Sequence, residues 1–115
     1  MHELSIALSI VEGAQGEAEL QGGGRVAGVH VRLGPLSGVV RESLAFAYDL
    51  ACEGTPLQGS RLVIEESPVR ILCPDCGEAR PPVSVRQLHC SVCGAAAHEV
   101  VSGAELELVA LELES

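Results

Sequence analysis

Two cysteine pairs constrain the fold of this chain more than any other feature. They read Cys73-Pro74-Asp75-Cys76 and Cys90-Ser91-Val92-Cys93, and each is followed by a glycine. A glycine there allows a tight turn of positive φ, so both sulfurs of a pair can reach one ion. Four thiolates with this spacing are typical of structural zinc. We therefore expect residues 69–101 to form a zinc-ribbon-like module held by Cys73, Cys76, Cys90 and Cys93.

Other uses of four cysteines have less support. Thiolates also suit iron, so the ligands alone leave a rubredoxin-type electron carrier open. Only 2% of the chain is aromatic, however, and the aromatic core expected around such a site is missing. A zinc ion with four protein ligands has no open coordination position for catalysis. Since no catalytic triad, phosphate loop or carboxylate pair is evident, we expect a binding protein rather than an enzyme.

Cationic side chains near the cysteines could offset the formal charge of −2 on zinc with four thiolates. The candidates in the sequence are Arg70, Arg80, Arg86 and His89. His89 adjoins Cys90 and His98 follows the second pair, so either could join a metal site. A surface histidine is the more ordinary interpretation of both.

Composition and charge narrow the compartment and the partners. The 115 residues carry 7 basic and 16 acidic side chains, a net charge of −9, which disfavours binding to nucleic acid. No secretory signal is present, and no apolar run approaches the ~20 residues of a membrane span. Five cysteines are an odd count for a disulfide framework. We expect a cytoplasmic protein without membrane insertion, whose small core gains from a metal crosslink.

Hydrophobic periodicity predicts an α/β fold, a small three-stranded mixed sheet with two helices plus the inserted module. Strand, helix and strand in succession favour a parallel pair, to which the last strand returns. The predicted domains are 1–68 with 102–115, and 69–101. The predicted elements are helices at 3–20 and 38–53 and strands at 25–33, 61–66 and 104–114.

Three details of these elements can be tested against a structure. The first helix should bury one face formed by Leu4, Ala7, Leu8, Val11, Ala14 and Ala18 and widened by Ile6 and Ile10. The second helix should have Ser37 as its N-cap. It should bury a stripe formed by Val40, Leu44, Ala47 and Ala51, joined by Phe46 and Leu50. Cys52, near its end, should be a small packed hydrophobic residue. In the last strand the apolar positions change phase near Val109, which indicates either burial of both faces or a β-bulge.

The N-terminus offers a second, different set of metal donors. If Met1 is retained, its α-amine (pKa ~7.7–8.0), the amide nitrogen and imidazole of His2, and the amide nitrogen of Glu3 could surround one ion. A planar array of nitrogens suits Ni(II) or Cu(II) better than zinc. From the chemistry alone, a frayed terminus is the more ordinary interpretation.

The sequence as a whole changes that balance. Its informative segments are Met1-His2-Glu3-Leu4-Ser5, Val31-Arg32-Leu33-Gly34, the segments 42–50 and 51–55, and the two cysteine pairs. Together they carry a resemblance to the HypA/HybF family of nickel metallochaperones in hydrogenase maturation. It implies nickel bound by His2 with backbone nitrogens near Met1 and Glu3, and zinc bound by the four cysteines. It also implies as partners the nickel-binding GTPase HypB and the hydrogenase large-subunit precursor, and for some relatives urease maturation.

The sequence thus predicts a nickel metallochaperone for [NiFe]-hydrogenase maturation, with Ni(II) as cargo and Zn(II) as a structural ion. The alternative is a zinc-ribbon interaction or adaptor protein that has no role in nickel delivery. Loss of nickel binding on removal of His2 would separate the two.

Overall fold

The computed structural model describes residues 3–114, which form parts of two compact units. We call one the helical unit; it comprises the chain up to Arg32, Val39–Glu65, and the chain from Glu107 on. We call the other the cysteine unit; it comprises Leu33–Gly38 and Glu66–Leu106. Within residues 3–114, no helix combines the length and apolar character needed to cross a membrane.

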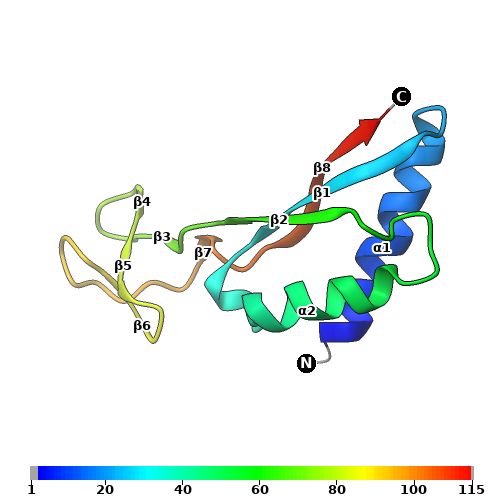
Figure 1. Cartoon of the computed structure of the whole chain (residues 1–115). Coiled ribbons are helices and arrows are strands. Elements are labelled where there is room, and N and C mark those ends of the chain that lie inside the picture. The colour runs from blue at the N-terminus through cyan, green and yellow to red at the C-terminus, as the bar shows by residue number, and fades with distance from the viewer. Residues whose placement is uncertain (1–2, 115) are drawn as a thin grey trace. The chain divides into compact units, whose positions relative to one another are not determined.

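The helical unit combines two helices with one three-stranded sheet. The helices are α1 (Glu3–Leu20) and α2 (Arg41–Cys52), and the strands are β1 (Arg25–Leu33), β2 (Arg61–Glu66) and β8 (Leu106–Glu114). The strand order is β2-β1-β8, so β1 is central. Figure 1 shows β1 and β2 running in one direction and β8 in the other, with both helices on the same side of the sheet. The expected fold class, with its mixed sheet, is confirmed.

Helix α1 has the predicted bounds, and its buried face is narrower than predicted. Its buried side chains are Ala7, Ile10, Val11, Ala14 and Ala18. Leu4 and Leu8 remain 47% and 50% exposed, so their predicted burial is wrong. Three of the five buried residues are alanines, and their small side chains let the backbone of α1 approach α2 and the sheet closely.

Helix α2 begins later than predicted, because the chain before it adopts a different local structure. Pro35–Ser37 forms a short 3₁₀ helix (η1), which ends at Gly38 with a φ of +80°. That left-handed conformation favours glycine and interrupts a right-handed helix. The predicted capping role of Ser37 is therefore wrong; Val40 precedes the first turn and makes no side-chain capping bond. The end is as expected, with Gly54 at a φ of +74°.

The core of α2 also differs from the predicted stripe. Leu44, Ala47 and Ala51 are buried as expected, and Cys52 is a packed residue with 3% exposure. Val40, Phe46 and Leu50 are largely exposed, contrary to the prediction. Tyr48 lies fully buried in their place. Its hydroxyl lies 2.6 Å from the Oγ of Ser60, so the polar end of the ring has a partner in the core.

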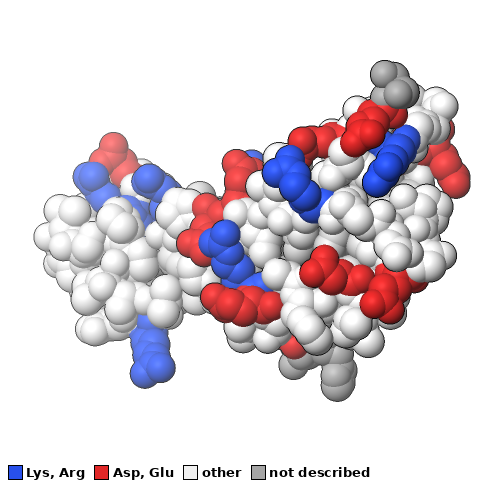
Figure 2. Space-filling view, in the orientation of Figure 1, with Lys and Arg blue, Asp and Glu red and all other residues white. Residues whose placement is uncertain are grey.

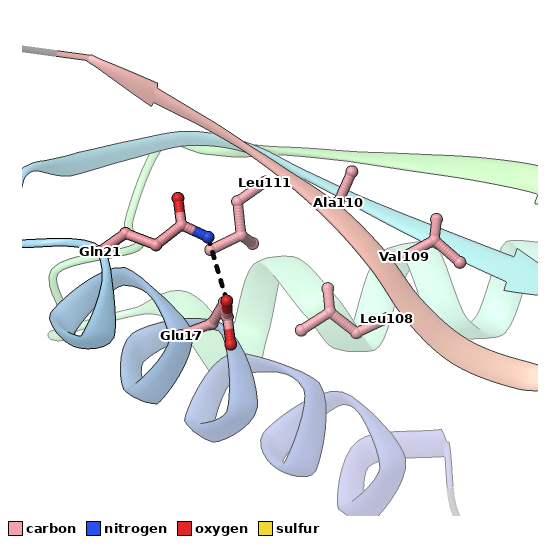
Figure 3. A pocket seen from close by; sticks show the side chains of 6 residues that line it. All are labelled: Glu17, Gln21, Leu108, Val109, Ala110 and Leu111. Atoms are coloured by element: carbon pink, nitrogen blue, oxygen red, sulfur yellow. Dashed lines mark hydrogen bonds between the residues drawn. The ribbon is translucent and has the colours of Figure 1, made fainter.

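Strand β8 changes phase along its length. Leu108 and Leu111 both point toward α1, although they are three residues apart (Figure 3). On the other side, Glu107 accepts a bond from Arg32 of β1 and Glu112 bonds His30 of β1. In a regular strand, positions separated by an odd number lie on opposite faces. Of the two interpretations left open by the sequence, these contacts support a β-bulge near residues 109–110.

A shallow pocket lies where β8 meets α1. It has a volume of about 300 Å³ and is lined by Glu17 and Gln21 of α1 and residues 108–111 of β8. The Nε2 of Gln21 donates to Oε1 of Glu17 at 3.0 Å on the helical side of the pocket (Figure 3). This bond pairs the two polar side chains that line the pocket.

The cysteine unit consists of short strands and turns. One sheet has the order β4-β3-β7, and β5 pairs with β6 in a separate hairpin. The strands are β3 (Arg70–Leu72), β4 (Ala79–Arg80), β5 (Pro82–Ser84), β6 (Gln87–Cys90) and β7 (Val100–Ser102). So little regular structure leaves few apolar side chains to bury, and Ile71, Cys73 and Cys90 are the most enclosed.

Two glycines, Gly34 and Gly103, allow backbone segments of the cysteine unit to approach one another closely. A Cβ on Gly34 would lie 2.1 Å from the carbonyl oxygen of Gly103, and a Cβ on Gly103 would lie 2.6 Å from the Cα of Val69. Two backbone hydrogen bonds form where these segments meet. The N–H of Gly34 donates to the carbonyl of Glu105 at 2.8 Å, and the N–H of Leu36 donates to the carbonyl of Gly103 at 2.7 Å. Residues far apart in sequence are therefore joined directly.

Candidate metal centre

The four cysteines converge on one point in the cysteine unit, as their spacing predicted. Their sulfur atoms all lie within 4.8 Å of one another. The Sγ of Cys93 lies 3.3 Å from that of Cys73 and 3.8 Å from that of Cys76. Four ligands at a Zn–S distance of ~2.3 Å in a tetrahedron have sulfurs ~3.8 Å apart. The arrangement therefore fits a tetrahedral metal ion of that size.

Each cysteine pair is shaped by the same backbone turn. The N–H of Gly77 donates to the carbonyl of Cys73, and the N–H of Gly94 to that of Cys90, both at 2.9 Å. The two glycines have φ angles of +71° and +78°, which side chains disfavour. We call these turns the first and second knuckles. Their likeness explains why a glycine follows each pair.

Backbone N–H groups point at the sulfurs and stabilise negative charge on them. The N–H of Cys76 donates to the Sγ of Cys73 at 3.3 Å, and that of Val92 to the Sγ of Cys90 at 3.4 Å. Backbone N–H groups of Cys93 and Val92 lower the pKa of Cys90 to about 6. At neutral pH, Cys90 is thus prepared as a thiolate ligand.

The other sulfurs cannot all ionise without a counter-charge. A hydrogen bond shared with Cys73 raises the pKa of Cys76. At Cys93 the largest single influence, the backbone N–H of Ala95, lowers the pKa, but the contact with Cys73, burial and the remaining thiols outweigh it and raise the pKa to about 12. Crowded thiolates repel one another. A divalent cation would supply the missing charge, so the donor set fits a metal ion.

The four ligands differ in their exposure to solvent. Cys73 and Cys90 are buried, Cys76 is half-buried and Cys93 is exposed. Cys90 lies at the end of β6 and Cys73 directly follows β3. The N–H of Cys73 donates to the carbonyl of Glu78, and that of Cys90 to the carbonyl of Ala95. The first cysteine of each knuckle is therefore both buried and held by a backbone hydrogen bond.

Of the nearby cations that the sequence suggested, Arg80 is placed beside the cluster. Its guanidinium lies against the sulfur of Cys76, which raises the pKa of Arg80, and its Nη2 donates to Oε2 of Glu78 at 2.6 Å. Arg70 and Arg86 are exposed. The ion pair with Glu78 was not anticipated, although Arg80 falls four residues after Cys76, within reach of one knuckle.

The histidines occupy three different environments. The Nδ1 of His89 lies 3.2 Å from the carbonyl oxygen of Gly94 in the second knuckle, whereas His98 is exposed. His30 bonds Glu112 in the helical unit. Met1 and His2, the predicted centre of the nickel site, lie outside the described residues. Glu3, which was expected to add a backbone nitrogen, is the first residue of α1.

Charge is distributed unequally between the two units. The helical unit carries 11 acidic and 4 basic side chains, and the cysteine unit 5 and 3. On the face shown in Figure 2, carboxylates and arginines are interspersed, with broad uncharged areas between them. The cysteine unit is thus nearly balanced before a metal binds, and its arginines are available to offset the charge of four thiolates.

Comparison with known proteins agrees with this arrangement. A family model described as "Hydrogenase/urease nickel incorporation, metallochaperone, hypA" matches residues 1–113. "Hydrogenase maturation factor HypA" from Roseiflexus sp. is 51% identical over 99% of this chain and 93% of its own length. The protein of the same name from Chloroflexus aurantiacus is 47% identical over 97% and 98%.

Solved structures share the fold. The solution structure of the Ni metallochaperone HypA from Helicobacter pylori superposes with a TM-score of 0.71 at 23% identity, covering 98% of this chain and 97% of the other. A second HypA solution structure gives a TM-score of 0.74 with similar coverage. The family match spans both units and includes the four cysteines. The chain therefore belongs to the HypA family of nickel-incorporation metallochaperones.

Proposed function

We propose that this protein binds Ni(II) at its N-terminus and delivers it for [NiFe]-hydrogenase maturation. The observation that carries the proposal is the family match, which begins at residue 1 and so takes in His2. The nickel donors would be the imidazole and amide nitrogen of His2 with backbone nitrogens of Met1 and Glu3. No catalytic step is needed, because the ion is cargo rather than a reactant.

The start of α1 supports this choice of donors. Glu3 is the first residue of the helix, and the first four N–H groups of a helix have no carbonyl partner within it. The amide nitrogen of Glu3 is therefore not committed to the helical hydrogen-bond ladder. A planar set of amine, amide and imidazole nitrogens favours Ni(II) or Cu(II) over zinc.

We assign Zn(II) to the four cysteines as a structural ion. Four sulfurs in a compact group give a closed coordination sphere, and zinc is the usual occupant. The N-terminal nitrogens and the cysteine sulfurs also differ in softness, so each site would select its own metal. On this proposal, residues 1–68 and 102–115 form the nickel domain and residues 69–101 the zinc module.

The partners and the compartment follow from the same role. A nickel carrier needs a donor or regulator and a recipient, which we assign to the nickel-binding GTPase HypB and the hydrogenase large-subunit precursor. Urease maturation proteins are further candidates, since the family description includes urease. Cysteines must stay reduced in order to bind zinc, and a reducing compartment keeps them so. We therefore place the protein in the cytoplasm.

A nickel titration tests the proposal. Full-length protein with an untagged N-terminus and one bound zinc is compared with His2→Ala by isothermal calorimetry. We expect one Ni(II) per chain in the native protein and at least a tenfold weaker affinity in His2→Ala, because the imidazole closes the chelate. Zinc content should be equal in both proteins.

The matched control is His98→Ala, which removes an exposed histidine that the proposal does not use. It should bind nickel like the unaltered chain. An additional glycine before Met1 should weaken binding as His2→Ala does, because it displaces the α-amine. Equal nickel affinity in His2→Ala and the native protein would refute the N-terminal site and leave the zinc-ribbon adaptor as the better description.

A further inference from the structure

The two knuckles share a backbone but differ in charged side chains. Cys76 is followed at the second and fourth positions by Glu78 and Arg80. The same positions after Cys93 hold Ala95 and Ala97. Charged side chains therefore accompany the first knuckle, and small apolar ones accompany the second.

Arg80 is held in place by three features. It lies in β4, where it pairs with Ile71 of β3, two residues before the first ligand. Its Nη2 donates to Glu78, and Cys76 lies near enough to the guanidinium to raise the pKa of Arg80. Its Nε is enclosed and has no hydrogen-bond partner among residues 3–114. Leaving a buried N–H unpaired is unfavourable, and attraction to a negatively charged metal–thiolate centre offsets that cost.

Cys93 has the opposite surroundings. It is the exposed ligand, next to Val92, which is 66% exposed. The N–H of Ala95 reaches its sulfur, but the residues of the second knuckle offer no cationic side chain. A thiolate that is already ionised becomes less nucleophilic when a neighbouring cation stabilises it, and its rate also depends on access, so Cys93 should react before Cys76.

We propose that Arg80 shields the Cys76 thiolate, so that ligand exchange at the metal centre begins at Cys93. The inference rests on the zinc assignment under Proposed function. In the exchange, an incoming thiol or amine donor forms a bond to zinc while the bond to the Cys93 sulfur breaks. Cys93 leaves as a thiolate, and the other three ligands keep the ion in place. Arg80 acts through Cys76 and is a positioning residue.

Cysteine labelling measured residue by residue tests this order. Zinc-loaded full-length protein is treated with limiting iodoacetamide, and each cysteine is followed by peptide mass spectrometry. We expect Cys93 to be labelled first. In Arg80→Gln, labelling of Cys76 should rise about fivefold, the scale of a partly exposed charge interaction. The rate at Cys93 should not change, because Arg80 acts only through Cys76.

Two variants and one internal reference complete the design. Arg86→Gln removes an exposed arginine of the same unit and should label like the native protein, and Arg80→Lys should restore part of the protection. Cys52, which is buried in the helical unit, reports general opening of the chain. A role of Arg80 in folding alone would raise labelling at all four ligands together.

Three outcomes would overturn the inference. They are first labelling at a cysteine other than Cys93, an unchanged rate at Cys76 in Arg80→Gln, or a uniform increase at all four ligands. A chain that takes up no zinc would overturn both this inference and the zinc assignment. Failure of nickel binding at His2 would leave the labelling order intact, so the two proposals can fail separately.

Discussion

At the scale of single residues, Tyr48 shows how one hydroxyl organises a core. It is the largest fully buried side chain, and its hydroxyl meets Ser60 Oγ at 2.6 Å. Ser60 Oγ in turn donates to the carbonyl of Leu57 at 2.6 Å, so the Tyr48 hydroxyl is the donor to Ser60. Burial raises the pKa of Tyr48 far above its usual range. The ring thus joins α2 to the chain that precedes β2.

The titration of this tyrosine can be measured directly, because the sequence contains one Tyr and no Trp. We expect phenolate absorbance at 295 nm to stay absent in folded protein at pH values above ~10, where a free tyrosine ionises. The folded state holds the proton more tightly than the unfolded state. Stability is therefore fully present below pH ~10 and declines as pH rises, by up to ~1.4 kcal/mol per unit.

Tyr48→Phe supplies the control for that decline. It should lower the free energy of unfolding at pH 7 by about 1 kcal/mol, because one buried hydrogen bond is lost. Its stability should also vary less with pH above 10. Phenolate absorbance appearing near pH 10 in protein whose circular dichroism is unchanged would contradict the buried, hydrogen-bonded ring.

The burial of Tyr48 could not be predicted from residue type alone. Hydrophobicity ranks Phe46 above Tyr48, and Phe46 was predicted to be buried, yet it is 70% exposed. The choice between them depends on Ser60, which supplies a partner for the hydroxyl from beyond the helix. The small residues Ala47 and Ala51 were placed correctly, since their helical spacing is local information.

At the scale of elements, one carboxylate links the three strands of the sheet. Glu112 of β8 bonds His30 of β1 at 2.8 Å and Arg61 of β2 at 2.8 and 2.9 Å. Gly28 makes this possible, because a Cβ there would lie within 2.4 Å of the carboxylate. The hydrogen bond to His30, together with Arg61, lowers the pKa of Glu112.

We expect Glu112→Gln to weaken the attachment of β8 at neutral pH. Because the pKa of Glu112 is lowered by folding, its stabilisation is present above pH ~4.3 and is lost as pH falls through the folded value. Tm should drop by about 2 °C at pH 7, since the pair is partly exposed. The difference from the unaltered protein should disappear near pH 3.

Glu114→Gln, on the same strand, is the matched control and should leave Tm within experimental error at both pH values. Thermal unfolding followed by circular dichroism at pH 7 and pH 3 provides the comparison. A Glu112→Gln protein as stable as Glu114→Gln at pH 7 would show that the carboxylate contributes nothing to holding the three strands.

The elements themselves were largely predictable, and their ends less so. Alternation within 25–33 and 61–66 predicted β1 and β2 with their observed bounds. The start of α2 was missed, because Gly38 adopts a left-handed conformation that the apolar stripe does not reveal. The bulge in β8 was left open, since its cause lies in contacts with α1 and β1 far away in sequence.

At the scale of the whole molecule, the two units differ in what stabilises them. The helical unit buries the faces of two helices against a sheet, whereas the cysteine unit has short strands and few enclosed apolar side chains. Domains with so small a core depend on a crosslink or a metal. Binding of zinc would contribute directly to the folding of the cysteine unit.

Removal of zinc should therefore unfold one unit selectively. With excess chelator, we expect circular dichroism at 222 nm to remain nearly constant, because α1 and α2 belong to the helical unit. Amide signals of residues 66–106 in the proton–nitrogen NMR spectrum should lose dispersion, and readdition of zinc should restore them. Signals of the cysteine unit that stay dispersed without zinc would contradict a metal-dependent fold.

The candidate site was the most predictable part of the molecule, for a physical reason. Two ligands of each knuckle are fixed by a local turn, so the spacing and the glycine reveal it. The surroundings of the ligands were less predictable. Arg80 reaches Cys76 through its strand pairing with Ile71, and His89 contacts the carbonyl of Gly94 rather than a sulfur. These two contacts depend on side-chain directions that are fixed only when the cysteine unit has folded.

The hydrogen bond between Gly34 and Glu105 also affects the order of folding. His30 and Glu112 are 82 residues apart, so pairing β8 with β1 from an open chain requires closing a very long loop. The folded cysteine unit joins Gly34 to Glu105, directly beyond the end of β1 and before the start of β8. Once it has formed, the remaining loop shrinks to a few residues. A metal captured by the cysteines thus lowers the entropic barrier to completing a sheet that contains none of them.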